Sequence, residues 1–203
     1  KPTPGPATGL QSVPGEVLLA PGQSAKFTVY KIDAHGERLG AADKVKWEKF
    51  IPPTAKVKAT ADADFNEAGE LAAGAAAKLS AGAFKATDAE GHSGTIRARV
   101  TTNLPIKQDF EAFAVDQDHA TETGTKFAYP PLPWLGARFK WEVRELEGNK
   151  VLAKTLDQMF FQRAFTFIGP ETLSNYTVSA DLMTDGNRRM KSDVGLINQR
   201  YQV

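Results

Sequence analysis

Apolar and polar residues alternate along most of the first half of the chain, as they do in half-buried β-strands. Strand-like segments lie at residues 16–20, 25–32, 45–48, 56–60, 82–87 and 95–100, and the alternation is clear at 25–32 and 56–60. Polar stretches that contain glycine separate them, such as residues 33–37, where Gly36 can adopt a positive φ at little steric cost. Short strands at this spacing predict a β-sandwich.

The alternation ends near Val100 and begins again after a connecting segment at residues 105–111. Residues 140–146 and 151–154 flank Gly148-Asn149, a turn sequence that predicts a hairpin. Further strands are expected at residues 163–169, 176–183 and 194–201. The sequence stops within the last of these alternations, so we expect residues 105–203 to be the front part of a larger β-domain that other residues complete.

The first half of the chain carries four motifs in a fixed order: PGQSAKFTVYKIDAHGERL, VKWE, NEAGELAA and GAFKATDAEGHSGTIRARV. A Pro-Gly turn before the second strand and a Gly-rich closing hairpin are typical of bacterial Ig-like domains, which residues 10–102 resemble. The resemblance implies a spacer or adhesion module without an active site of its own.

The second half carries DFE, WEVRELEGNKVL and FIGPETLSNYTVSADLMTDGNRRMKSDVGLINQRY, and it resembles a laminin-G or concanavalin-A-like jelly roll. The two halves together resemble the C-terminal region of bacterial PQQ-binding-like β-propeller repeat proteins, which are exported. No propeller repeat lies in this sequence, so quinone binding is not carried over and no cofactor is expected. The expected fold is all-β, with a Pro-rich linker at residues 1–9, an Ig-like β-sandwich at 10–104 and a partial jelly roll at 105–203.

Charge and composition exclude several classes of function. The chain has 25 Lys and Arg against 24 Asp and Glu, a net charge of +1, which argues against a nucleic-acid partner. It has no apolar run near the roughly 20 residues of a membrane helix. Cysteine is absent, which removes disulfides and thiol chemistry. The lack of cysteine and the resemblance both fit an extracytoplasmic protein of the periplasm or cell surface.

Residues that could carry chemistry are scattered. His35, His92 and His119 each lie in a turn or polar loop without metal-ligand spacing, and we interpret them as solvated. Glycosidases need two convergent carboxylates. Glu142 and Glu145 are an odd number of residues apart on one expected strand and so face opposite sides. We interpret them, and the pair Asp181 and Asp185, as solvated carboxylates.

One stretch has the alternating oxygen ligands of a calcium loop. It contains Asp62, Asp64 and Asn66, but it lacks the glycine and the spaced glutamate of an EF-hand. We therefore keep two alternatives open here, a calcium site and a solvated loop.

A basic turn and several aromatic residues are the candidate ligand-binding positions. Asp185, Arg188 and Arg189 lie in this turn, which could bind an anionic group through the arginine forks or could be a charged surface turn. Sugar rings stack on aromatic side chains, and the candidates are Tyr129, Trp134, Trp141, Tyr176 and Tyr201. Trp134, in a Pro-rich loop with Tyr129, is the one most expected to be exposed.

These observations predict a non-catalytic accessory segment that spaces, docks or binds, with carbohydrate or another protein subunit as its partner. A protein partner, or further residues, would cover the sheet edge left open in the second module. Two alternatives remain: a fragment of a concanavalin-like enzyme that processes carbohydrate, and a structural subunit of an envelope or electron-transfer complex.

Overall fold

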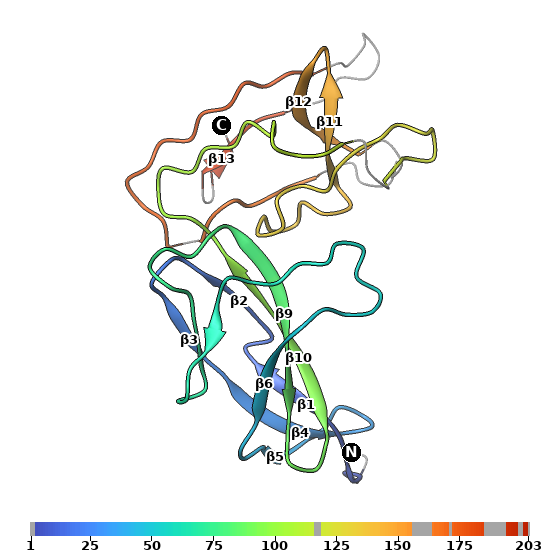
Figure 1. Ribbon diagram of the computed structural model, residues 1–203, viewed down its shortest axis with the longest axis vertical. Helices are drawn as coiled ribbons and strands as arrows, with labels where there is room; N and C mark the ends of the chain where they lie inside the picture. The colour runs from blue at the N-terminus through green and yellow to red at the C-terminus, as the bar shows by residue number, and fades with distance from the viewer. Residues whose placement is uncertain are drawn as a thin grey trace. The chain divides into compact units, whose positions relative to one another are not determined.

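The computed structural model describes residues 3–115, 119–155, 164–170, 172–184, 194–198 and 201–202. Every regular element in these residues is a β-strand, so the predicted all-β class is confirmed (Figure 1). The chain divides into two compact units, Lys1–Ile168 and Gly169–Val203. In the described residues, no helix is long and apolar enough to cross a membrane.

Three sheets form the first part of the larger unit. One sheet has the order β1 (Ala7–Val13), β4 (Thr28–Asp33), β5 (Arg38–Ala41). The second has the order β2 (Glu16–Leu19), β10 (Ser93–Val100), β9 (Ser80–Thr87), β6 (Lys46–Phe50), with β2 parallel to β10. The third has the order β3 (Ser24–Lys26), β8 (Glu70–Ala72), β7 (Asp64–Phe65). β1 begins inside the stretch that the sequence predicts as a linker.

Two glycines show how the chain is layered over the second sheet. A Cβ on Gly94 of β10 would lie 2.2 Å from the carbonyl oxygen of Leu10, and a Cβ on Gly82 of β9 would lie 2.4 Å from the amide nitrogen of Ala61. Because Cβ atoms stand out from the face of a sheet, β1 passes over the face of β10 and the chain at Ala61 passes over the face of β9. Both crossings require glycine.

The Ala61 crossing explains one wrong prediction. Residues 56–60 alternate between exposed and half-buried, as the sequence indicates, but they form no strand. The chain approaches β9 from above at Gly82 rather than along an edge, so its backbone joins no ladder. The alternation therefore predicted the burial of residues 56–60 correctly, but it predicted wrongly that their backbone pairs in a sheet.

A single aromatic cluster fills the core between the layers. Phe84 is 2% exposed and lies among the buried residues Leu19, Ala61, Ala63, Leu71, Ala73, Ile96, Ala98 and Val100. Trp47 of β6 stacks on Phe65 with ring centroids 4.2 Å apart, and Phe65 meets Phe84 edge-on. Trp47 also packs against a second buried group of Leu10, Val29 and Ala86. Burial of these rings away from water stabilises the sandwich.

Four tight turns have the same construction. In each turn, the backbone N–H of the first residue donates to the carbonyl of the last residue, and the carbonyl of the first residue accepts the N–H of the glycine. The side-chain oxygen of the first residue also accepts the N–H of the last residue. Each glycine has a positive φ, between 74° and 89°. This is the geometry of a three-residue hairpin loop. The turns span residues 33–37, 66–70, 88–92 and 121–125, and they begin with Asp33, Asn66, Asp88 and Thr121.

The predicted hairpin of the second half is confirmed as β11 (Trp141–Leu146) and β12 (Asn149–Lys154). Its turn is Glu147-Gly148, with φ values of 50° and 83°, one residue earlier than predicted. Two consecutive positive φ values match the hairpin twist. Ala128 exchanges both backbone hydrogen bonds with Val143 and so extends this small sheet beside β11.

Of the remaining strand predictions, residues 25–32 are confirmed with one interruption, and the later segments are largely wrong. The predicted strand 25–32 is split into β3 and β4. In the described part of 163–169, only Phe167 pairs, in a single bridge with Leu135. Residues 176–183 form no strand. Residues 194–201 contain β13 (Ile197–Asn198), which pairs with β14 (Tyr201–Gln202). Strand-favouring residues are not sufficient to form a strand, because a strand also needs a neighbouring strand to pair with.

Candidate functional site

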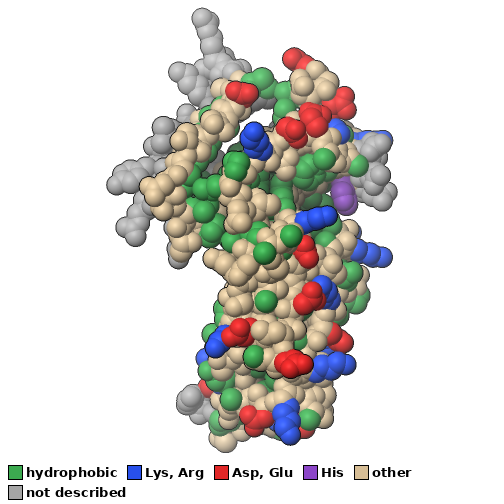
Figure 2. Space-filling view, turned by 60° about the vertical axis from the view of Figure 1, so that its left-hand side comes forward, with side chains coloured by type: hydrophobic (Ala, Val, Ile, Leu, Met, Phe, Trp, Pro, Cys, Tyr) green, Lys and Arg blue, Asp and Glu red, His purple; other side chains and the backbone are tan. Residues whose placement is uncertain are grey.

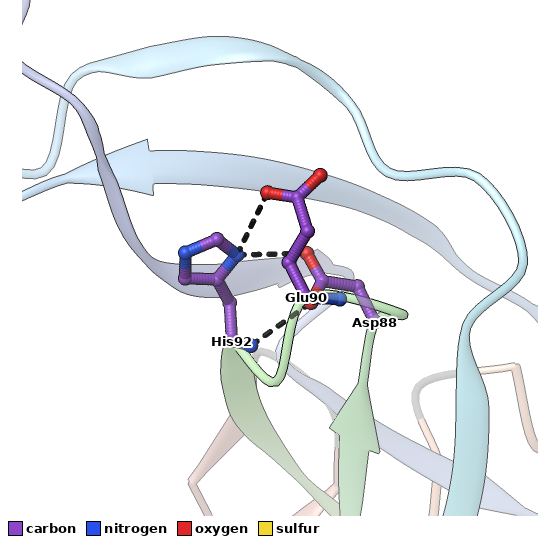
Figure 3. A group of neighbouring side chains, drawn as sticks. All are labelled: Asp88, Glu90 and His92. Atoms are coloured by element: carbon purple, nitrogen blue, oxygen red, sulfur yellow. Dashed lines mark hydrogen bonds and ion pairs between the residues drawn. The ribbon is translucent and has the colours of Figure 1, made fainter.

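The tip of the β9–β10 hairpin brings Asp88, Glu90 and His92 together (Figure 3). Nδ1 of His92 lies 2.9 Å from Oδ2 of Asp88 and 3.7 Å from Oε2 of Glu90. One potential ligand atom from each residue lies within 4.8 Å of the others, close enough for a metal ion. The sequence interpretation of His92 as a solvated turn histidine missed this group, although residues 88, 90 and 92 are spaced by two across a turn.

A lysine offsets part of the negative charge of this group. Nζ of Lys31 lies 2.5 Å from Oε1 of Glu90 and 3.8 Å from Oδ2 of Asp88. The hydrogen bond to Glu90 raises the pKa of Lys31. Burial raises the pKa of Asp88, but hydrogen bonds from His92 and Glu90 outweigh it and hold that pKa below its ordinary value. The tip therefore has the geometry of a closed ion-pair network that stabilises its own turn.

The residues proposed for calcium each have a different partner. Oδ2 of Asp62 accepts the backbone N–H of Lys78 at 2.8 Å, and Oδ1 of Asp64 lies 2.8 Å from Nζ of Lys49. Oδ1 of Asn66 accepts the N–H of Glu70 at 2.9 Å, as the first residue of its turn. These contacts explain the polar residues through local structure, and the calcium site stays a prediction.

A small aromatic pocket lies beside β11. Its volume is about 130 Å³, and it is lined by Ala120, Phe127, Tyr129, Phe139, Trp141, Glu142 and Thr155. The Phe127 and Tyr129 rings meet edge-on at 5.5 Å, and Tyr129 and Phe139 do so at 6.4 Å. The ring of His119 lies 4.5 Å from that of Tyr129. We call this set the Tyr129 pocket.

Glu142 supplies the carboxylate of the Tyr129 pocket. Its interpretation as a solvated residue is wrong, because Glu142 is only 5% exposed, whereas Glu145 is exposed on the same strand. Its Oε2 accepts the Arg144 guanidinium, with the Nε contact at 2.7 Å, and its Oε1 accepts the Thr155 hydroxyl at 2.6 Å. A buried carboxylate held in this way is a fixed hydrogen-bond acceptor.

The Tyr129 pocket also includes a residue with an unused donor. Nε1 of Trp141 is buried and has no hydrogen-bond partner in the described part of the chain. Buried donors usually have a partner, so an orphan at a pocket indicates a ligand or a bound water. The sequence named Trp141 among its aromatic candidates, but Phe127, Phe139 and Thr155 gave no signal.

The other predicted site residues lie elsewhere. Trp134 is half-buried, meets Phe110 edge-on at 5.8 Å, and does not line the Tyr129 pocket. Asp185, Arg188 and Arg189 lie outside the described residues. Tyr129 and Trp141 are therefore the sequence candidates that line the pocket. Arg138 flanks Tyr129, with its Cζ atom 4.8 Å from the ring centroids of both Tyr129 and Phe139.

Tyr129 also lines a larger open cleft of about 600 Å³ in the same unit. The cleft is bordered by Lys56, Val57, Lys58, Leu79, Ser80, Ala112, Phe113, Ala114, His119, Ala128 and the segment 129–133. Three prolines, Pro130, Pro131 and Pro133, give the segment a fixed and mostly apolar surface. We call this the proline cleft.

No family model matches the chain, and neither does any curated protein. The site must therefore be interpreted from its own geometry.

Proposed function

We propose that the chain is a non-catalytic accessory module of an extracytoplasmic protein, and that its second half binds carbohydrate at the Tyr129 pocket. The observation that carries the proposal is a pocket lined by Trp141, whose buried Nε1 has no partner among the described residues, together with the Glu142 acceptor and aromatic rings. A sugar hydroxyl both donates and accepts hydrogen bonds, and the C–H face of the ring packs on aromatic side chains.

The size of the pocket limits what enters it. A volume of about 130 Å³ is well below the ~300 Å³ at which sites for whole small molecules begin. We therefore assign to the Tyr129 pocket the edge of one sugar unit, with the rest of the glycan outside. The sandwich formed by β1–β10 would act as the rigid support, which agrees with the spacer role implied by the Ig-like resemblance.

The bonding of Glu142 favours binding over catalysis. A glycosidase acid or base must exchange a proton with the substrate. Both oxygens of Glu142 are already engaged, one by Arg144 and one by Thr155. A carboxylate held in this way is positioned to accept a further hydrogen bond from a ligand hydroxyl.

The test is a screen of the purified chain against immobilised oligosaccharides, followed by calorimetric titration of the best ligand. Trp141→Phe keeps an aromatic ring but removes the Nε1 donor, and it should weaken binding about tenfold. Trp134→Phe is the matched control, because Trp134 does not line the pocket, and it should bind as the unmodified chain does. Equal binding by both variants would remove the support for this site.

A protein partner is the second candidate, and a specific surface favours it. Phe165 and Phe167 are 36% and 51% exposed, two residues apart on one extended segment, and Ile168 beside them is 40% exposed. Such a row of apolar side chains on a barely paired segment suits an added β-strand. A photo-crosslinking residue at Phe167 should capture a partner from the native host extract, while the same residue at exposed Leu39 should not.

A further inference from the structure

The Tyr129 pocket and the proline cleft both have Tyr129 in their lining. The cleft volume of about 600 Å³ lies within the ~300–1,000 Å³ range of sites for whole ligands. A ligand that contacts Tyr129 therefore lies beside both the pocket and the cleft. The charged residues in and beside the two linings decide what kind of ligand it is.

The ionisable side chains in the lining of the cleft are Lys56, Lys58, His119 and Tyr129, so none of its lining residues is acidic. Lys56 and Lys58 are exposed, and neither has a carboxylate partner among the residues that the structure describes. Lys26, Lys31 and Lys49 are paired with acidic residues, whereas Lys44 and Lys46, like the cleft lysines, have no ion pair to a described residue. What sets Lys56 and Lys58 apart is that both line a cleft without acidic lining residues.

A third exposed cation, Arg138, lies beside Tyr129. The Arg138 guanidinium lies over the Tyr129 and Phe139 rings, and its side chain is exposed, with no ion pair to another described residue. Elsewhere on the sandwich, acidic and basic side chains are interspersed (Figure 2). Exposed cations in the lining of the cleft and over the Tyr129 ring create a local positive potential that attracts anionic ligands.

We propose that the ligand is an anionic glycan, a chain with carboxylate or sulfate groups that crosses Tyr129 and pairs with Lys56, Lys58 and Arg138. This inference rests on the proposed carbohydrate binding and adds the charge class of the ligand. One sugar edge enters the Tyr129 pocket, and the acidic groups of the following units meet the lysines of the cleft. The glycan thus gains specificity from the aromatic ring and most of its attraction from charge.

The experiment compares four probes of similar length by calorimetry at low and at high salt. The probes are an oligogalacturonate, a sulfated dextran oligosaccharide, a neutral malto-oligosaccharide and a single-stranded oligodeoxynucleotide. The carboxylated or the sulfated glycan should bind at least about tenfold more tightly than the neutral one, and salt should weaken it. The preferred glycan identifies which acidic group the cleft takes.

Variants connect the effect to the cleft. Lys56→Gln with Lys58→Gln should weaken binding of the anionic glycan about tenfold. Lys44→Gln with Lys46→Gln is the charge-matched control. Both residues are exposed, and Lys46 pairs with Thr87. Thr87 is the last residue of β9, whereas the cleft residue Ser80 is the first. Both pairs are on the surface, so both variants should fold.

The outcomes separate the two proposals. If neutral and anionic glycans bind equally and the lysine variants change nothing, the charge inference is overturned while carbohydrate binding stands. If no glycan binds, both fail. If the oligonucleotide binds as tightly as the glycans, the cleft recognises anions without regard to sugar, and the inference is also overturned.

Discussion

The side chain of Asp88 contacts His92 twice across the tip of the β9–β10 hairpin. Oδ1 of Asp88 accepts the backbone N–H of His92 at 2.9 Å, and Oδ2 lies 2.9 Å from Nδ1 of the same residue. At the equivalent tip, Oδ1 of Asp33 accepts the N–H of Glu37 at 2.9 Å, and its Oδ2 accepts the N–H of Gly5. The two aspartates therefore close turns of the same design, each with a second contact of its own.

This bonding predicts a loss of stability in acid. The hydrogen bond from Gly5 is the largest cause that lowers the pKa of Asp33. Burial raises the pKa of Asp88, but hydrogen bonds from His92 and Glu90 outweigh the effect of burial and lower it. Both folded-state pKa values thus lie below the unfolded value of about 3.9. The unfolded chain binds more protons in acid, so stability present above that pH is lost as pH falls through the folded pKa.

Thermal denaturation across this range checks the prediction. Asp33→Asn with Asp88→Asn keeps an Oδ1 acceptor, as Asn66 shows at its own turn, so the variant should fold at neutral pH. Its melting temperature should fall less steeply below about pH 4 than that of the unmodified chain. Equal acid slopes for the two proteins would show that these aspartates do not govern acid stability.

Gly82 and Gly94 should not tolerate a side chain. Gly94→Ala would press a Cβ against the backbone of Leu10 and Gly82→Ala would press one against the backbone of Ala61, and backbone cannot rotate away. Overpacking of this kind costs roughly 1–3 kcal/mol or more of unfolding free energy. Gly74→Ala is the control, since nothing lies within 4 Å of its added Cβ and its φ is not positive. Urea denaturation measures all three, and similar midpoints would contradict the layered packing.

The hydroxyl of Thr155 should stabilise the fold through Glu142. Thr155→Val keeps the shape of the side chain but removes a 2.6 Å hydrogen bond to a buried carboxylate, so unfolding free energy should fall by about 1.5–3 kcal/mol. Thr95→Val, at an exposed position of β10, should change it by less than about 0.5 kcal/mol. If denaturant titration gives both variants the same stability, Glu142 does not depend on this bond.

The parts of the fold that the sequence predicted are those in which local chemistry and tertiary pairing agree. The β9–β10 and β11–β12 hairpins combine alternation with glycine turns. The failures are segments whose alternation found no partner strand, such as residues 176–183. The repeated turn was present in the sequence as DAHGE, NEAGE, DAEGH and TETGT, and it explains Asn66 without a metal ion.

The candidate site was only partly predictable. Tyr129 and Trp141 were visible as aromatic residues, but burial of Glu142 depends on Arg144 and Thr155, and the chain reaches Thr155 only by returning along β12. Strand alternation correctly separated Glu142 from Glu145, yet it could not say which of the two faces inward. Cross-strand contacts supplied that information.

Fluorescence of Trp141 tests carbohydrate binding at the Tyr129 pocket most directly. In a Trp134→Phe chain the remaining tryptophans are Trp141 and Trp47, and Trp47 packs in the sandwich core. Titration with the oligogalacturonate, the sulfated dextran oligosaccharide or the malto-oligosaccharide should give a saturable change in emission with at least one of them, and Trp141→Phe added to that chain should abolish it. No change with any glycan, or the same change without Trp141, would contradict the account.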